Sequence, residues 1–307
     1  MANIRKVLVV IDPETPGSAL DRAAHLVGRT KAQVMLFGGA YDSYLDDSLQ
    51  PAAAAAARES LLAQHGKRLE ELAAPLKKQG LDVVADVSWG RPLHDSIIRK
   101  AVEWGADVVV KDTHYQSALR RSIFSNTDWN LIRHCPMPLL LVKPRPLGPV
   151  PRIVAAVDPL HPRDKAATLD NRIVTSAKEL AQALGGQTHL LHVCETTPFI
   201  LASSEAMVAP ISASMPQLVA DLESGHAKAV QALADSHGIA REHVHMRSGA
   251  TRNTIVELTD EVQADVLVMG AVARGALERL FVGSTAEAVL DKLSCDVLIV
   301  KPADFTA

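Results

Sequence analysis

The chain has 307 residues, enough for two domains of about 150 residues, and its 48% apolar and 22% charged residues are ordinary for a globular protein. A net charge of −3 and an aromatic content of 4% argue against general attraction to nucleic acid or anionic membranes. No apolar run approaches the roughly 20 residues that span a bilayer, and the three separated cysteines suggest no disulfide framework, so we expect a cytoplasmic protein.

Strand and helix patterns alternate through the first half. Unbroken apolar, β-branched runs predict buried parallel strands, and apolar residues at helical spacing predict helices. This alternation predicts right-handed βαβ crossovers and a doubly wound α/β sheet. Strands are expected at Val7–Ile11, Val34–Phe37, Val83–Val87, Val108–Val110 and Leu139–Val142, with helices at 18–29, Pro51–Gln79, Leu93–Trp104 and Thr127–His134.

The same pattern then restarts after a Pro/Gly-rich linker, Arg145–Pro151. The clearest echo is Ala106–Pro144, which aligns without a gap with Ala264–Pro302, both beginning Ala-Asp-Val and ending Val-Lys-Pro. Chance similarity would rarely keep register through two turns, so we infer a duplicated domain. The expected domains are residues 1–145 and 152–307.

Four features of the second half carry a family resemblance. Asp158 follows the strand-like run Arg152–Val157, Gly270 follows another such run, Gly283-Ser284 form a small-residue turn, and Val300-Lys301-Pro302 closes the last strand. Together with the duplication, these features make the sequence resemble the tandem members of the universal stress protein family. The resemblance implies two nucleotide alpha-hydrolase-like folds, each with five parallel strands in the order 3-2-1-4-5 and helices on both faces.

The resemblance also implies a role for the two closing strands. In relatives these are edge strands that pair antiparallel between subunits, and the proline ends the ladder. Two copies in one chain therefore imply an intramolecular pseudo-dimer and leave a further homodimer open. The alternative, two domains without an interface, would leave two apolar edges unpaired.

The second half also carries most of a ligand-binding pattern. Glycine turns and helix N-termini present backbone N–H groups that suit a phosphate. Nucleotide-binding relatives carry G-x2-G-x9-G-[ST], which falls here on Gly270, Ala273, Gly283 and Ser284, with alanine replacing the second glycine. The resemblance implies an adenine site at Asp158 and Val193, a ribose and phosphate site at Met269, Gly270, Ala273, Arg274, Gly283, Ser284 and Thr285, and Mg²⁺ as the counterion of ATP.

Several of these positions also allow an interpretation without a ligand. If Ala273 needs positive φ, its side chain costs on the order of 1 kcal/mol. Arg274 either pairs with a phosphate or lies on a solvated turn. Asp158 also fits an ordinary Asp-Pro turn, and Val193 also fits a core position.

Other chemistry is sparse in the sequence. His243 and His245 alternate on a strand-like stretch without a third ligand spaced for zinc, and the twelve histidines show no cluster, so no metal site is expected. No residue stands out as a general base, so we expect no catalytic residues and no efficient enzyme, although slow ATP hydrolysis stays open.

The first half departs from the motif. Asp112, Tyr115, Ser125 and Asn126 stand at the positions of Gly270, Ala273, Gly283 and Ser284. A carboxylate about 4 Å from a phosphate costs roughly 4 kcal/mol at an effective dielectric near 20. We therefore expect the first half to bind no ATP in the family manner.

One long apolar stretch, Thr196–Glu223, is expected to connect a strand to the next helix, and three prolines interrupt it. Such a segment must cover something, either its own domain's core or a cavity for an acyl chain. Three functions follow: a stress-response protein that binds ATP, acting as a sensor or chaperone-like partner; a binder of a lipid-like or apolar small molecule; or a structural interaction protein with vestigial pockets.

Overall fold

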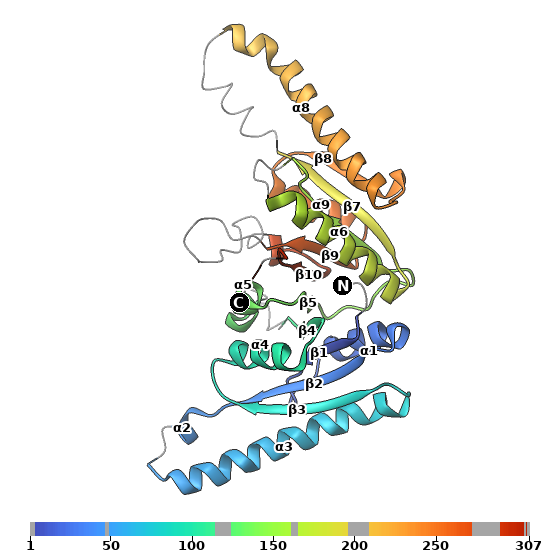
Figure 1. Cartoon of the computed structure of the whole chain (residues 1–307). Coiled ribbons are helices and arrows are strands. Elements are labelled where there is room, and N and C mark those ends of the chain that lie inside the picture. Colours follow the sequence, from blue (N-terminus) through green and yellow to red (C-terminus); the bar gives the residue numbers. More distant parts are fainter. Residues whose placement is uncertain are drawn as a thin grey trace. The chain divides into compact units, whose positions relative to one another are not determined.

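The structure is a computed structural model that describes residues 4–46, 49–113, 124–160, 165–195, 209–271, 289–303 and 305. The chain divides into two compact units, Met1–Pro146 with Phe305–Ala307, and Leu147–Asp304 (Figure 1). The pairing expected between the two closing strands stays a prediction.

The first unit is a parallel sheet with the strand order β3-β2-β1-β4-β5. This is the expected 3-2-1-4-5 order, so that prediction is confirmed. The elements are β1 (Lys6–Val10), α1 (Ser18–Thr30), β2 (Gln33–Ala40), α2 (Ser43–Asp46), α3 (Pro51–Lys78), β3 (Val83–Trp89), α4 (Leu93–Trp104), β4 (Val108–Asp112), α5 (Asn126–His134) and β5 (Leu139–Val142).

The second unit repeats this topology, with the strand order β8-β7-β6-β9-β10 and parallel pairing throughout. A 3-10 turn, η1 (Arg241–His243), precedes its third strand. The other elements are β6 (Arg152–Ala156), α6 (Lys165–Leu184), β7 (Gln187–Cys194), α8 (Ala209–Ser236), β8 (Val244–Ser248), α9 (Thr251–Glu261), β9 (Val266–Gly270) and β10 (Asp296–Val300).

The central strands of each sheet form the core, as their apolar runs predict. Four of the five residues of β1 and of β9 are buried, and every residue of the outer strands β5 and β10 is buried as well. In the first unit α1 packs against β1 and β4, and in the second unit α6 packs against β6 and β9. This arrangement leaves the carboxyl ends of the parallel strands at one edge of each sheet, where open α/β sheets bind ligands.

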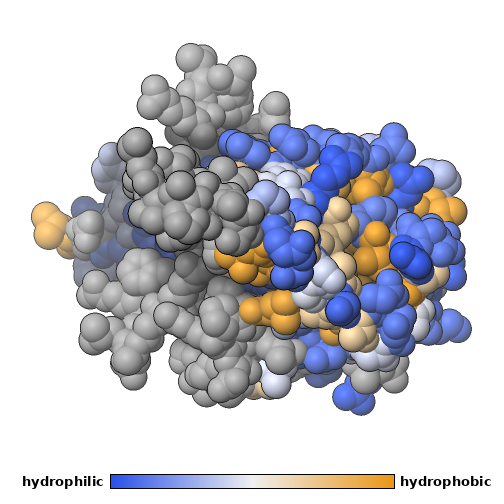
Figure 2. All heavy atoms as spheres, turned by 90° about the horizontal axis from the view of Figure 1, so that it is seen from above, coloured by the Kyte–Doolittle hydropathy of each residue, from blue (hydrophilic) through white to orange (hydrophobic). Residues whose placement is uncertain are grey.

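The long apolar connection was predicted with the wrong extent. Residues 209–223 are not part of a loop, because they form the first half of α8, which continues to Ser236 with Pro216 inside it. Residues 196–208 lie outside the described part of the chain. Seen from above, small groups of hydrophobic residues lie among hydrophilic ones (Figure 2), and Leu160 and Leu218 are exposed. Among the described residues, no helix is long and apolar enough to cross a membrane.

Candidate functional site

The candidate site of the second unit lies at the carboxyl edge of its sheet. Asp158 follows β6 by two residues and has an exposed side chain. Its backbone N–H donates a hydrogen bond of 3.2 Å to Oδ1 of Asp170, a buried residue of α6. The first turn after β6 is therefore tied to the helix that packs over the strand.

Two other strands bring predicted residues to the same edge. Val193 lies near the end of β7, where it is half-buried, and Met269 and Gly270 end β9. Since β7 and β9 are the two neighbours of β6, their carboxyl ends flank Asp158. Four of the nine predicted site residues are thus gathered at one edge. The other five, Ala273, Arg274, Gly283, Ser284 and Thr285, lie outside the described residues.

Gly270 has a packing role that the motif did not reveal. A Cβ at this position would lie 2.7 Å from Cδ2 of Leu169 and 3.2 Å from Cδ1 of Ile173, both on α6. Contacts this short force a neighbour to move, so glycine lets α6 approach the end of β9 closely. Gly270 therefore has a packing role that is independent of a phosphate, since a larger residue would displace the ends of these two side chains.

In the first unit, Asp112 occupies the position of Gly270 and makes a structural contact. Its Oδ1 accepts a hydrogen bond of 2.8 Å from the backbone N–H of Ala19, in the first turn of α1. A Cβ on Gly17, the N-cap residue, would lie 2.6 Å from Cγ of Asp112. The positive end of α1 thus receives an anion from within the chain, where a free anion would otherwise be attracted.

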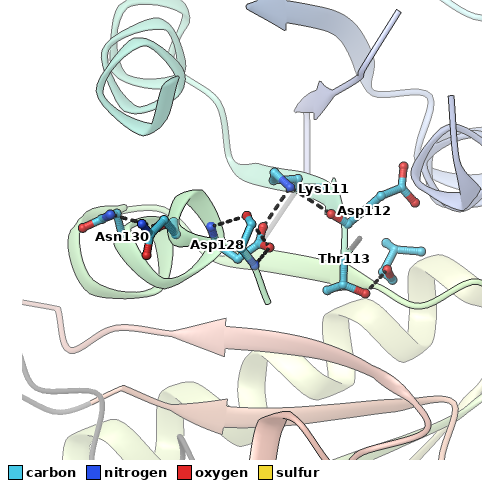
Figure 3. Close-up of polar contacts among 8 residues, drawn as sticks. Lys111, Asp112, Thr113, Asp128 and Asn130 are labelled. Atoms are coloured by element: carbon cyan, nitrogen blue, oxygen red, sulfur yellow. Dashed lines mark hydrogen bonds and ion pairs between the residues drawn. The ribbon is translucent and has the colours of Figure 1, made fainter. Parts of the chain in front are cut away.

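A buried ion pair lies directly beside Asp112 (Figure 3). Lys111 Nζ lies 2.8 Å from Oδ1 of Asp128, and their side chains are 6% and 0% exposed. The same Nζ donates a hydrogen bond of 2.9 Å to the carbonyl oxygen of Asp112. Met269 and Ala286 are the aligned residues of the second half, so this charged pair belongs to the first unit alone.

The same aspartate also starts α5. Asp128 Oδ2 accepts hydrogen bonds from the backbone N–H and the hydroxyl of Ser125, and the Asp128 N–H donates to the Ser125 hydroxyl. This is a reciprocal capping box. Ser125 and Asn126 were predicted as positions where a phosphate turn had been lost, and here they serve as a helix start.

The sequence prediction that the histidines form no cluster was wrong. In the second unit His192, buried in β7, lies 2.8 Å from His226 of α8, measured between Nε2 and Nδ1. Asp158 lies beside this pair, and one ligand atom from each of the three residues falls within 4.8 Å of the others. The contact joins segments far apart in sequence, so local spacing gave no signal.

A second histidine cluster lies at the opposite end of β7. His189 Nδ1 lies 3.0 Å from Nε2 of His245, and the His189 and His243 rings are 4.4 Å apart between centroids. Burial, and then repulsion from His243, His245 and Arg152, lower the pKa of His189 from 6.5 to about 4. Of the strand-like stretch expected here, His243 belongs to η1 and only His245 lies on β8, and both are half-buried beside His189.

Near Asp158, burial shifts the pKa values of two further groups, His192 and Cys194. Burial lowers the pKa of His192, although the Val157 carbonyl and Asp158 oppose the change. Burial, with the carboxylates of Glu223 and Asp158, raises the pKa of the Cys194 thiol. The imidazole is therefore favoured as neutral and the thiol as protonated, so Cys194 has no character of an activated nucleophile.

The fold and this edge define a tandem α/β protein of the universal stress class. The sequence profile of the universal stress protein family matches residues 3–143 and 150–301, and the chain belongs to this family. It is 30% identical to universal stress protein E of Escherichia coli strain K12 over 310 residues, covering 99% of this chain and 96% of that protein. A homologue from Haemophilus influenzae is 27% identical over 312 residues.

Solved structures agree with this assignment. A functionally unknown protein from Pseudomonas aeruginosa PAO1 has a TM-score of 0.75 and 27% identity, covering 98% of this chain and 94% of that chain. A universal stress protein from Archaeoglobus fulgidus, 16% identical, has a TM-score of 0.58 and covers 98% of both chains, which supports the fold alone. The tandem fold and the stress-response family are thereby established.

Proposed function

We propose that the second unit binds a nucleotide, ATP in the first instance, and that the protein acts as a sensor or chaperone-like partner in the stress response. Asp158 and Val193 would contact the base. Met269, Gly270, Ala273, Arg274, Gly283, Ser284 and Thr285 would contact the ribose and phosphates, with Mg²⁺ as the counterion of the phosphates.

One contrast between the units carries this proposal. In the first unit the edge holds its own anion, Asp112, on the N-terminus of α1, and the Lys111–Asp128 ion pair beside it. The second unit has Gly270 in place of Asp112, and its sequence keeps Gly283-Ser284. A carboxylate at the end of the fourth strand would repel an incoming phosphate. The first unit has such a carboxylate and the second unit does not.

Calorimetric titration of the full chain with Mg-ATP tests the proposal. Gly283→Asp should weaken binding by about a thousandfold, because one like-charge contact costs roughly 4 kcal/mol. The matched control in the first unit is Asp112→Asn, which removes the carboxylate there and should leave the ATP affinity of the chain unchanged.

The same preparation separates the alternatives. An acyl-bearing molecule found by mass spectrometry of the purified protein would favour the apolar-ligand function. Absence of saturable ATP binding by the wild-type chain would contradict the nucleotide proposal and leave an interaction protein with vestigial pockets.

A further inference from the structure

We propose that Asp158, His192 and His226 form a binding site for a divalent transition metal ion of the zinc type. The site lies at the carboxyl edge of the second sheet, between the end of β6, the end of β7 and the middle of α8. The proposal does not rest on nucleotide binding, although Asp158 takes part in both.

The donor set is suitable for such an ion. Two imidazole nitrogens and one carboxylate oxygen, all within 4.8 Å of one another, can reach a common ion with small movements. Zinc accepts imidazole and carboxylate ligands, and three protein ligands with an open fourth position are typical of its non-structural sites. Because Asp158 is exposed, that fourth position would face solvent or a ligand oxygen.

The hydrogen bonding of His192 fixes the nitrogen that a metal needs. His192 Nδ1 lies 2.8 Å from the carbonyl oxygen of Val157, and a carbonyl can only accept, so Nδ1 carries the proton. The neutral ring then presents the Nε2 lone pair toward His226. A ligating histidine usually donates its other N–H to such a carbonyl, which sets its tautomer and orientation.

The contact with His226 shows where the ion would lie. With His192 Nε2 as acceptor, the 2.8 Å contact to His226 Nδ1 is a hydrogen bond in which His226 donates. A cation between the rings would lie where the Nδ1 proton of His226 now lies, and that proton would leave Nδ1. His226 would then carry its proton on Nε2, which changes its tautomer without changing its charge.

The negative charge around the pair favours a cation. One oxygen of the Asp158 carboxylate lies within 4.8 Å of a ring nitrogen of each histidine. Glu223, one turn before His226 on α8, accepts a hydrogen bond from the hydroxyl of Ser248. A divalent ion would bring positive charge to a half-buried region that contains two carboxylates.

In the test, the chelator-treated full chain is titrated with Zn²⁺ alone, without nucleotide, and binding is measured by calorimetry at neutral pH. We expect saturation at one ion per chain. His226→Gln keeps a polar side chain of similar reach but removes the imidazole, and it should weaken Zn²⁺ binding by at least about tenfold. Asp158→Asn should weaken it as well. Co²⁺ titrated into the wild type should give visible absorption bands that His226→Gln loses.

The second histidine cluster supplies the matched control. His245→Gln alters a histidine on the neighbouring strand and should leave Zn²⁺ affinity unchanged, while far-UV circular dichroism checks that each variant is folded. Gly283→Asp should keep Zn²⁺ binding even if ATP binding is lost, so failures of the two proposals are distinguishable. Absence of saturable binding by the wild type, equal affinity in His226→Gln, or loss of binding in His245→Gln would overturn the proposal.

Discussion

A buried lysine in the first unit lies against a buried aspartate, and the second half of the same chain shows what replaces them. Lys111 and Asp128 correspond to Met269 and Ala286. Removing one partner of a buried pair leaves an uncompensated charge and costs about 3–5 kcal/mol, whereas an apolar pair can be close to neutral. The second half therefore indicates the two substitutions for a double-mutant cycle, Lys111→Met and Asp128→Ala.

We predict that Asp128→Ala lowers the free energy of unfolding of the first unit by about 3 kcal/mol or more. Adding Lys111→Met should restore most of this loss. About 1 kcal/mol should remain, because Asp128 also completes the capping box with Ser125. Urea unfolding followed by tryptophan fluorescence measures each variant, and losses that simply add in the double variant would contradict a coupled pair.

The sequence locates individual site residues on their strands but does not predict their tertiary contacts. Asp158 was placed at the carboxyl end of a strand, because strands and the residues that follow them can be located from local patterns. The packing role of Gly270 was missed, since it depends on how closely Leu169 approaches. The contact between His192 and His226 was also missed, because it arises when α8 packs over β7.

Among the elements, α1 starts in an unusual way. Its N-cap residue is Gly17, which has no side chain to cap the helix, and the cap comes from Asp112 at the end of β4. Helix and strand thus stabilise each other across the edge of the sheet. The cap gives the Asp112 carboxylate a structural role at a position where the second half has glycine.

We predict that Asp112→Ala destabilises the first unit by about 1 kcal/mol, the usual value of a lost cap, while Asp112→Asn keeps an acceptor and costs less. Gly17→Ala should cost about 1–3 kcal/mol in the wild type, because its Cβ meets the Asp112 carboxylate. The same change should cost less in the Asp112→Ala background. Equal costs of Gly17→Ala in both backgrounds, measured by urea unfolding, would argue against the contact.

The bounds of most elements were predicted well, and the wrong start predicted for α8 has a physical cause. Leu93–Trp104 and Leu139–Val142 have the predicted bounds, because strong apolar periodicity and clear end signals coincide there. The start of α8 was placed too late, since prolines in an apolar stretch argue against a helix interior. Pro216 nevertheless lies inside α8, and Pro75 lies inside α3 of the first unit.

At the scale of the whole molecule, the two units differ in the side chains that can be used to follow their unfolding. Trp89, Trp104 and Trp129 all belong to the first unit, so tryptophan fluorescence follows that unit alone. The two described histidine clusters belong to the second unit. Tryptophan fluorescence therefore reports on the first unit, and substitutions in the histidine clusters act on the second.

This separation allows a pH prediction for the second unit. The pKa of His189 is lowered to about 4, and burial also lowers the pKa values of His192, His237 and His245. Between about pH 4 and 6.5 the unfolded chain therefore binds more protons than the folded unit. Its free energy of unfolding must fall as the pH drops through this window, and solvent screening limits the share of His189 to about 1–2 kcal/mol.

Hydrogen exchange of peptides from β7 and β8, at pH 7 and pH 5 in the presence of a chelator, measures this loss after correction for intrinsic rates. His189→Leu removes one proton-binding group from the linkage, so its second unit should lose less stability than the wild type on acidification. The urea midpoint of the first unit, followed by fluorescence, should be the same in both proteins. An equal loss in wild type and variant would show that the His189 cluster does not couple folding to pH.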